Sequence, residues 1–246
     1  MSRQASYLEF SHFLKASRLC LPFTEILRQN RDKSILEYTA VKNVIKYTYK
    51  ANALFALVRR TRYIKRWSLM FNVSEENVGE HSHEVAIFAH GIAVIGMNNF
   101  GRAYNPERIG MIAVYHELSE SVLGDQPTTL KHATEETTAF FKGIEGEVEK
   151  DIVDTLPSSI RNHMASLTLS SQFLEHEKDI VKAADLLSML LKCDHELSLG
   201  NREFSSARDK VWRKFQHYIE VYPEVKEFYE IHMTQHQQTI DGLVNL

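Results

Sequence analysis

Apolar residues recur at spacings of three and four along most of this 246-residue chain, and this helical period is its dominant pattern. Residues that interrupt helices are scarce, because the chain has only 10 glycines and 5 prolines. A helix with an apolar stripe is stable when that stripe packs against another element, here another helix. We therefore predict an all-α fold.

The clearest boundary signals frame a helix over residues 106–123. Asn105 is a favourable N-cap, Pro106 fits the first helical position, and Gly124 follows the last periodic residue. The same period predicts further helices over residues 34–60, 77–97, 135–155, 157–167, 179–199 and 204–222, and a last helix that begins at Pro223.

The domain organisation follows from these helices. We expect a helical N-terminal extension over residues 1–52 that packs on a core domain over residues 53–222, followed by a C-terminal helix over residues 223–246. Residues 125–128 have the composition of a loop. No repeat or low-complexity tract divides the chain further.

Charge, hydropathy and cysteine usage argue against several classes of protein. The net charge of −3, with both signs interspersed, does not attract a nucleic-acid polymer. The longest apolar stretch, Val85–Met97, is interrupted by His90 and is shorter than the roughly 18 residues that a membrane span requires. Two lone cysteines, Cys20 and Cys193, and no basic-then-apolar leader over residues 1–17 predict a cytoplasmic protein without disulfides.

The 12 histidines point to chemistry, because imidazole is the commonest metal ligand and the usual acid or base near neutral pH. In the expected helix over residues 106–123, His116 and Glu120 share the face that carries Ile109 and Ile112. Burying such a group without a partner destabilises the fold by about a few kcal/mol. His116 and Glu120 therefore need to bond to each other, to bind a metal or to lie in a water-filled cleft. For this pair alone, a core histidine bonded to Glu120 is the simpler interpretation.

Two other titratable residues lie on or beside apolar faces. Glu117 lies one step round from His116, beside Gly110 and Ala113, and these small residues leave room for a ligand or another backbone. His81 lies on the apolar stripe of the helix expected over residues 77–97. A second histidine therefore points at the core.

The apolar segment over residues 180–193 carries four polar residues within an arc of about 120°: Lys182, Asp185, Ser188 and Lys192. A solvated stripe would explain this arc. The wall of a water-filled active-site cleft would explain it equally, with the lysines available to phosphate oxygens. The spacing alone leaves both interpretations open.

One competing motif begins at His116, because His116-Glu117 starts like the zincin pattern His-Glu-x-x-His. Glu120 stands where the second histidine of that pattern belongs. No downstream ligand pattern compensates for its absence. A metallopeptidase is therefore disfavoured.

Taken in order, the candidate residues form a more specific set: Arg66-Trp67, Glu80-His81-Ser82, His116-Glu117, Glu120, Gly124–Thr128 and Lys182–Asp185. This set resembles the HD-domain metal-dependent phosphohydrolases, most closely the bacterial 5′-deoxynucleotidase family. The resemblance extends from about residue 53 to residue 207. It implies a helical bundle with a metal site between core helices.

The resemblance also implies one divalent metal ion held by four residues: His81, His116, Glu117 and Asp185. Two imidazoles and two carboxylates suit Co, Mn, Fe, Ni or Zn better than Ca. The family pattern has Asp where this chain has Glu117. The ligand oxygens of Glu117 therefore lie about one C–C bond further from the backbone.

Roles in catalysis and substrate binding follow from the same resemblance. Glu120 matches the carboxylate that orients or deprotonates the attacking water, and Asp125 matches a loop carboxylate close to the leaving oxygen. Arg66 matches a phosphate contact, and Trp67 matches the residue that excludes a 2′-hydroxyl. The expected substrate contacts are Arg66, Trp67, Asp125, Thr128 and Lys182.

The leading hypothesis is a metal-dependent phosphohydrolase that removes the 5′-phosphate of deoxyribonucleoside 5′-monophosphates. A deoxynucleoside triphosphate triphosphohydrolase is the enzymatic alternative, with Lys182, Lys192 or Lys131 available to the additional phosphates. A non-catalytic nucleotide-binding module with a degraded metal site is the alternative from another class. The expected partner is a small-molecule nucleotide, and the resemblance suggests a homodimer.

Overall fold

The computed structural model describes residues 48–244 of the chain. The chain separates into two units, residues 1–47 and residues 48–246. Most of the predicted N-terminal extension therefore lies outside the described residues. Within the described range the regular elements are helical, and an isolated bridge between Lys65 and Asn77 is the only strand-like pairing there. The all-α prediction is confirmed.

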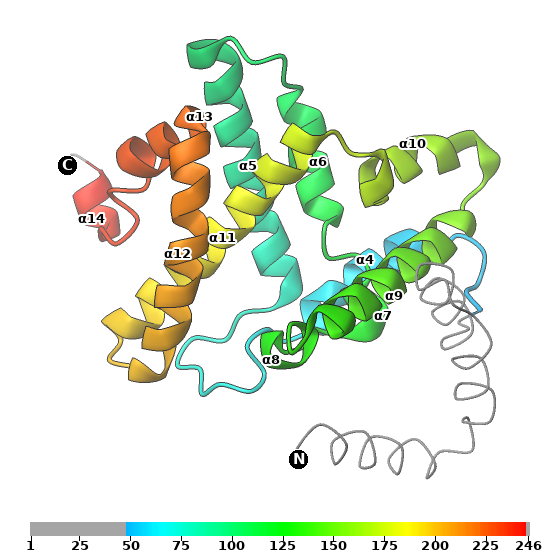
Figure 1. The fold of residues 1–246 in the computed structure, drawn as a ribbon, viewed down its shortest axis with the longest axis horizontal. Helices are drawn as coiled ribbons and strands as arrows, with labels where there is room; N and C mark the ends of the chain where they lie inside the picture. Colours follow the sequence, from blue (N-terminus) through cyan, green and yellow to red (C-terminus); the bar gives the residue numbers. More distant parts are fainter. Residues whose placement is uncertain (1–47, 245–246) are drawn as a thin grey trace, which may run out of the picture. The chain divides into compact units, whose positions relative to one another are not determined.

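Four helices form the core of the described unit: α5 (Val78–Phe100), α6 (Pro106–Tyr115), α11 (Glu175–Ser198) and α12 (Ser205–Val221). Helix α5 packs against both α6 and α11, and α11 also packs against α12 (Figure 1). Val85 and Ile92 of α5, Ile112 of α6 and Leu187 of α11 are fully buried, each with 0% exposure. The apolar stripes of the core helices therefore meet in one core.

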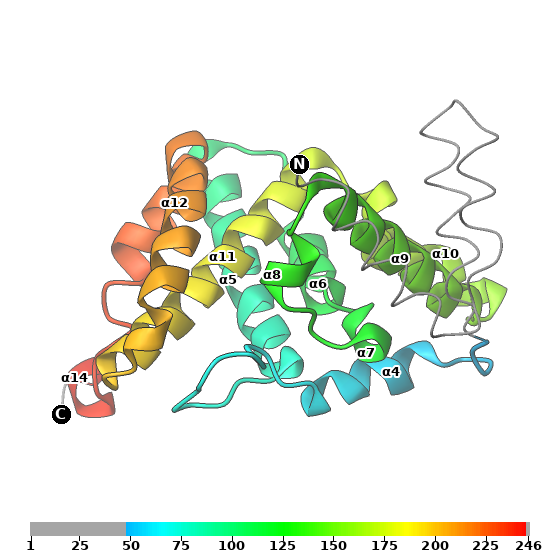
Figure 2. The same cartoon turned by 60° about the horizontal axis from the view of Figure 1, so that its bottom comes forward.

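The other elements surround this core. They are α4 (Leu54–Arg60), α7 (Glu120–Leu123), α8 (Thr128–Lys131), α9 (Glu135–Asp154), α10 (Ser158–Thr168), α13 (Pro223–Glu227), α14 (Ile240–Leu243), a π-helical turn (Phe228–His232) and 3₁₀ turns at Thr61–Tyr63, Ser170–Gln172 and Arg202–Phe204. Helices α4, α7 and α8 lie near the N-terminal half of α5 in both views (Figures 1 and 2). None of the helices over residues 48–244 has the length and hydropathy needed to cross a membrane.

Helix α5 begins where its sequence predicts. The Asn77 side chain accepts a hydrogen bond from the Glu80 backbone N–H at 3.0 Å, and the Glu80 carboxylate accepts one from the Asn77 N–H at 3.2 Å. This reciprocal pair is a capping box. It fixes the first turn of the helix and therefore the position of His81.

The prediction of one continuous helix over residues 106–123 is wrong for residues 116–119. Helix α6 begins at Pro106 as predicted but ends at Tyr115, and α7 begins only at Glu120. The His116 ring nitrogen Nδ1 lies 2.6 Å from the Ala113 carbonyl oxygen, which an unbroken α-helix would give to the N–H of residue 117. Bonds of the i to i+3 type follow over residues 115–122, as in a 3₁₀ turn.

The predicted helix over residues 34–60 is also wrong in its described part. Residues 48–53 are not helical, and Asn52 has a left-handed φ of 61°. The Asn52 and Ala53 N–H groups donate to the backbone oxygen and the side-chain oxygen of Thr155. Because the backbone is engaged elsewhere, the helix begins at Leu54.

The C-terminal segment over residues 223–246 is not one helix. It begins at Pro223 as predicted, but a π-helical turn over Phe228–His232 follows, and the short α14 is separate. The wider turn lets adjacent rings pack on different helices, since Phe228 contacts Phe88 of α5 and Tyr229 contacts Phe215 of α12. The other predicted helices agree with α9, α10 and α12 within one residue, and α11 begins one turn earlier than predicted.

A buried carboxylate fastens the loop before α5 to α11. Glu196 is fully buried and accepts hydrogen bonds from the N–H groups of Val73 and Ser74, from Lys192 Nζ at 2.5 Å and from Asn201 Nδ2 at 2.8 Å. Burial alone would raise the pKa of Glu196, but these donors lower it to about 2. The carboxylate is therefore ionised at neutral and mildly acidic pH.

We expect Glu196→Gln to lower the free energy of unfolding at pH 7 by about 3 kcal/mol, because it leaves the Lys192 ammonium buried without an anionic partner. Since the folded-state pKa lies below the ordinary 4.5, this stabilisation is present above that pH and is lost as the pH falls towards 2. Urea unfolding at pH 7 and pH 3 measures both effects. The exposed Glu175→Gln on the same helix is the control, with an expected change of about 0.5 kcal/mol or less. A loss equal at both pH values would contradict the prediction.

Candidate metal centre

Four titratable side chains meet between the core helices. His81 extends from α5, Asp185 from α11, and His116 and Glu117 from the turn after α6. One ligand atom from each residue lies within 4.8 Å of the others. His81 Nε2 lies 3.2 Å from Asp185 Oδ1, and His116 Nε2 lies 3.4 Å from Glu117 Oε1. The structure therefore brings together the four residues predicted as ligands.

Hydrogen bonding on the far side of each imidazole makes this cluster suitable for a metal ion. The Ala113 carbonyl can only accept, so His116 Nδ1 carries a hydrogen and donates it. His81 Nδ1 lies 3.0 Å from Ser188 Oγ. Both Nε2 atoms are buried and have no hydrogen-bond partner among the described residues. Two free nitrogens facing two carboxylates are a donor set for a divalent transition metal.

The charges of the cluster also favour a cation. Burial alone would raise the pKa of Asp185, but Lys182 Nζ at 2.6 Å and His81 hold it well below its ordinary value. Burial alone would likewise raise the pKa of Glu117, but His116 and Arg66 lower it. Burial lowers the pKa of His116. Two ionised carboxylates and a neutral imidazole are thus present near neutral pH.

Glu120 is the first residue of α7 and is buried beside this cluster. Burial and the neighbouring carboxylates of Glu117 and Asp125 raise the pKa of Glu120 to about 10. A divalent cation held by the four ligands would favour the ionised form. His116 bonds to the Ala113 carbonyl instead of Glu120, so the simpler interpretation of a histidine–glutamate core pair is wrong.

Arg66 and Trp67 are held rigidly in the loop before α5. Glu76 Oε2 accepts from Arg66 Nε at 3.1 Å and from Trp67 Nε1 at 3.0 Å, and Asp125 Oδ2 accepts from the Trp67 N–H at 3.2 Å. Trp67 has a left-handed φ of 58°, and its ring contacts Phe204 at 5.3 Å between centroids. The loop that carries both residues is therefore tied to the loop that carries Asp125.

The Arg66 guanidinium lies in the field of the cluster. Burial alone would lower the pKa of Arg66, but Glu76, Glu117, Asp185 and Glu120 raise it. Arg66 is 8% exposed, so its charge is only weakly screened by solvent. This is the cation that the sequence predicts for the substrate phosphate, and it lies beside the metal centre.

Lys182 and Thr128 lie less centrally than the other candidates. Lys182 has a half-exposed side chain that pairs with Asp185. Thr128 is exposed at the N-terminus of α8, and its substrate contact stays a prediction. The solvated-stripe interpretation of the arc on α11 is wrong, because Asp185, Ser188 and Lys192 are each at least nine-tenths buried.

Gly110 and Glu76 shape the surroundings of the cluster. Of the two alternatives for the space beside Gly110, the structure favours another backbone over a ligand, because a Cβ at residue 110 would lie 3.3 Å from His90 Cβ and 3.7 Å from the Ala86 backbone oxygen of α5. The glycine permits close packing of α6 on α5 instead. The sequence analysis missed Glu76, which holds Arg66 and Trp67 together. Its position in a loop gave no periodic signal.

The fold is shared with solved HD-domain phosphohydrolases. It is similar to an HD-domain phosphohydrolase from Listeria innocua, with a TM-score of 0.65, 22% identity, and coverage of 75% of this chain and 89% of that chain. It is also similar to the cyanophage S-2L HD phosphohydrolase DatZ bound to dA and one catalytic Zn²⁺ ion, with a TM-score of 0.56, 16% identity, and coverage of 78% and 99%. The described unit thus has the fold of HD-domain phosphohydrolases.

Sequence similarity then identifies the family. Residues 53–236 match the model of the YfbR-like 5′-deoxynucleotidases. The 5′-deoxynucleotidases of Vibrio cholerae serotype O1 and Citrobacter koseri are each 41% identical to this chain, over 157 and 162 residues. The matches cover 64% and 66% of this chain and 81% of each relative. The chain belongs to the YfbR-like 5′-deoxynucleotidase family, which is a family of phosphohydrolases.

We expect the full chain to bind about one Co²⁺ or Mn²⁺ ion, and His116→Ala to lose most of this binding because a nitrogen ligand is removed. Elemental analysis after loading and desalting measures the bound metal. His83→Ala is the control, since His83 is exposed on α5. Glu120→Ala should keep the metal and lose most turnover. Equal metal contents in wild type and His116→Ala would contradict the assignment of the cluster.

Proposed function

We propose that this chain hydrolyses the 5′-phosphate of deoxyribonucleoside 5′-monophosphates and uses one divalent transition metal. The observation that carries this proposal is the position of Arg66 and Trp67, which Glu76 and Asp125 hold beside the cluster of candidate ligands. A nucleotide needs a cation for its phosphate and an aromatic side chain beside its sugar. Arg66 and Trp67 offer these two groups next to the candidate metal centre. The family to which the chain belongs supports the same substrate class.

Four residues would hold the metal: His81, His116, Glu117 and Asp185. The metal would supply positive charge that polarises a phosphoryl oxygen and favours the ionised form of an attacking water. Arg66 binds the remaining phosphate oxygens, and its buried guanidinium needs no reorganisation to do so. The chain's own residues thus orient the phosphate before the proton transfers begin.

Two carboxyl groups are positioned for the two proton transfers. Glu120 lies beside the ligands without belonging to them, so it accepts the proton of the attacking water. Asp125 donates a proton to the leaving 5′-oxygen, and burial raises its pKa above the ordinary value, which favours the protonated form that this role requires. The Trp67 N–H fixes one oxygen of Asp125, which leaves the other oxygen for the substrate.

The lysines argue against the triphosphate alternative. Lys131 pairs with Glu145 at 2.5 Å, Lys182 with Asp185 at 2.6 Å, and Lys192 with Glu196 at 2.5 Å. Lys192 also donates to the Ser74 backbone oxygen and is buried. Each of the three cations considered for additional phosphates is therefore already neutralised by a carboxylate.

We further propose that the enzyme works as a cytoplasmic homodimer on a free nucleotide. The net charge of −3 supports a small-molecule substrate over a nucleic-acid polymer. Sedimentation of the purified full chain tests the dimer independently of activity.

We expect wild type to hydrolyse deoxyribonucleoside monophosphates in preference to ribonucleoside monophosphates, because the Trp67 ring crowds a 2′-hydroxyl. Trp67→Ala should narrow this preference more than it lowers kcat/KM on the deoxy substrate. The measurement is phosphate release from matched deoxy and ribo substrates at saturating metal. Trp67→Phe, which keeps an aromatic wall, is the control. Equal kcat/KM of wild type on the deoxy and ribo substrates would contradict the role of Trp67 in excluding the 2′-hydroxyl. Release of triphosphate from a deoxynucleoside triphosphate would support the triphosphohydrolase alternative.

We expect Glu117→Asp to lower activity at saturating metal. The longer carboxylate already reaches the cluster, with Oε1 3.4 Å from His116 Nε2, so the shorter side chain withdraws its oxygens by about one bond length. A misplacement near 1 Å costs on the order of a hundredfold in rate. Steady-state kinetics over a range of metal concentrations measures the effect. A gain of about tenfold or more would support the degraded-site alternative.

A further inference from the structure

A chain of hydrogen bonds leads from the metal centre along the face of α5 that packs against α11. His81 Nδ1 lies 3.0 Å from Ser188 Oγ, and the Ser188 hydroxyl donates to Glu84 Oε2 at 2.5 Å. Glu84 lies one turn after His81 on α5, whereas Ser188 lies on α11. The three residues therefore cross the contact between the two core helices.

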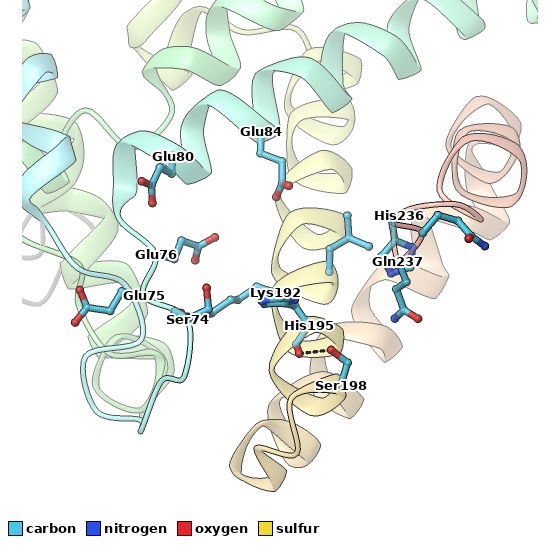
Figure 3. A pocket seen from close by; sticks show the side chains of 12 residues that line it. Ser74, Glu75, Glu76, Glu80, Glu84, Lys192, His195, Ser198, His236 and Gln237 are labelled. Carbon is cyan, nitrogen blue, oxygen red and sulfur yellow. Dashed lines mark hydrogen bonds between the residues drawn. The ribbon is translucent and has the colours of Figure 1, made fainter. Parts of the chain in front are cut away.

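The far end of this chain lies in a pocket separate from the candidate ligands. Figure 3 shows Glu84 extending from α5 towards the pocket, which Glu76 and Lys192 also line. Ser188 is fully buried between the pocket and His81. No ligand role is required of Glu84, because its carboxylate lies behind His81 and outside the cluster.

The direction of these hydrogen bonds can be deduced from the number of protons. A serine hydroxyl has one hydrogen, and Ser188 gives it to Glu84, which accepts when ionised. Ser188 Oγ therefore faces His81 with a lone pair, so His81 Nδ1 must carry the hydrogen of that bond. In the neutral ring this leaves Nε2 unprotonated. That Nε2 is the buried atom without a partner, 3.2 Å from Asp185 Oδ1.

We infer that Glu84, acting through Ser188, is a positioning residue that holds His81 in the tautomer and orientation required of a metal ligand. This inference rests on the metal centre of the proposed function. Burial raises the pKa of Glu84 above its ordinary value. The hydrogen bond from the Ser188 hydroxyl acts in the opposite direction and favours the ionised carboxylate. A ligating histidine whose other nitrogen donates to an acceptor binds its metal more tightly.

Both histidines of the cluster carry the hydrogen on Nδ1, but they donate it to different kinds of acceptor. His116 donates to a backbone carbonyl, which no substitution at residue 113 removes. His81 depends on two side chains, Ser188 and Glu84, so its tautomer can be altered by substitution. Substitutions can therefore change the tautomer of His81 but not that of His116.

Histidine-ring NMR of the full chain, stripped of metal by a chelator, measures the tautomer directly. Wild type should show His81 with hydrogen on Nδ1, and its resonance is assigned by its loss in His81→Asn. Glu84→Ala should give a mixture of tautomers, because Ser188 is then free to donate to the ring. Glu84→Gln, whose amide oxygen still accepts from Ser188, should keep the wild-type tautomer. An unchanged tautomer in Glu84→Ala would overturn the inference.

Co²⁺ affinity, followed by its visible absorption, measures the effect on the ligand. Ser188→Ala and Glu84→Ala should each raise the Co²⁺ dissociation constant by about 10- to 100-fold, and Glu84→Gln should restore most of the affinity. Glu84→Ala in the Ser188→Ala background should add no further loss, because Glu84 acts only through Ser188. Glu75→Ala is the matched control, since it removes a carboxylate from the same pocket and Glu75 pairs with exposed Lys65.

The two readouts distinguish this inference from the proposed function. Wild type that binds no more Co²⁺ than His116→Ala refutes the metal centre, whereas the tautomer measurement still tests Glu84. Losses of Co²⁺ affinity that add in the double variant would show that Glu84 acts on the ion by charge alone and would overturn the inference. A loss of Co²⁺ affinity in Glu84→Gln as large as the loss in Glu84→Ala would also overturn the inference.

Discussion

The hydrogen bond between His116 Nδ1 and the Ala113 carbonyl is the interaction on which the site depends. It uses the acceptor that would continue α6, and at this point the helix ends at Tyr115 and i to i+3 turns follow. The same bond places the hydrogen on Nδ1 and leaves Nε2 free at the cluster. One contact therefore fixes the tautomer of a candidate ligand at the place where α6 gives way to the turn before α7.

Three carboxylates, of which only Glu196 is fully buried, organise the surroundings of this turn. Glu76 holds Arg66 and Trp67, and Asp125 holds the Trp67 backbone. Glu196 fixes the loop that carries Glu76 by accepting from backbone N–H groups. A buried carboxylate is costly unless its oxygens are satisfied, and the fully buried Glu196 accepts from four donors, whereas Glu76 accepts from two. These hydrogen bonds tie the loop of the substrate residues to its neighbours, as a preorganised site requires.

The sequence predicted those features that depend on local signals. The capping box at Asn77 and the Asn105-Pro106 start both correspond to real helix ends, because caps act within a few residues. The break after Tyr115 was missed because a side chain competing for a carbonyl leaves no trace in hydrophobic period. Glu76 and the Glu84–Ser188 pair were missed because each acts across elements far apart in the chain. The ligand set itself came from family resemblance, since spacing alone left Asp185 ambiguous.

The length of Glu117 and the turn that carries it form one structural solution. Glu117 belongs to no helix, so its backbone position is set by the turn over residues 116–119 rather than by α-helical geometry. Its carbonyl accepts from the Glu120 N–H at 3.1 Å, which begins α7. A shift of the Glu117 backbone therefore moves the Glu120 carboxylate as well. The side chain that faces the metal centre and the side chain assigned to the attacking water are therefore linked through one turn of backbone, so that a change in the backbone at Glu117 is passed on to Glu120.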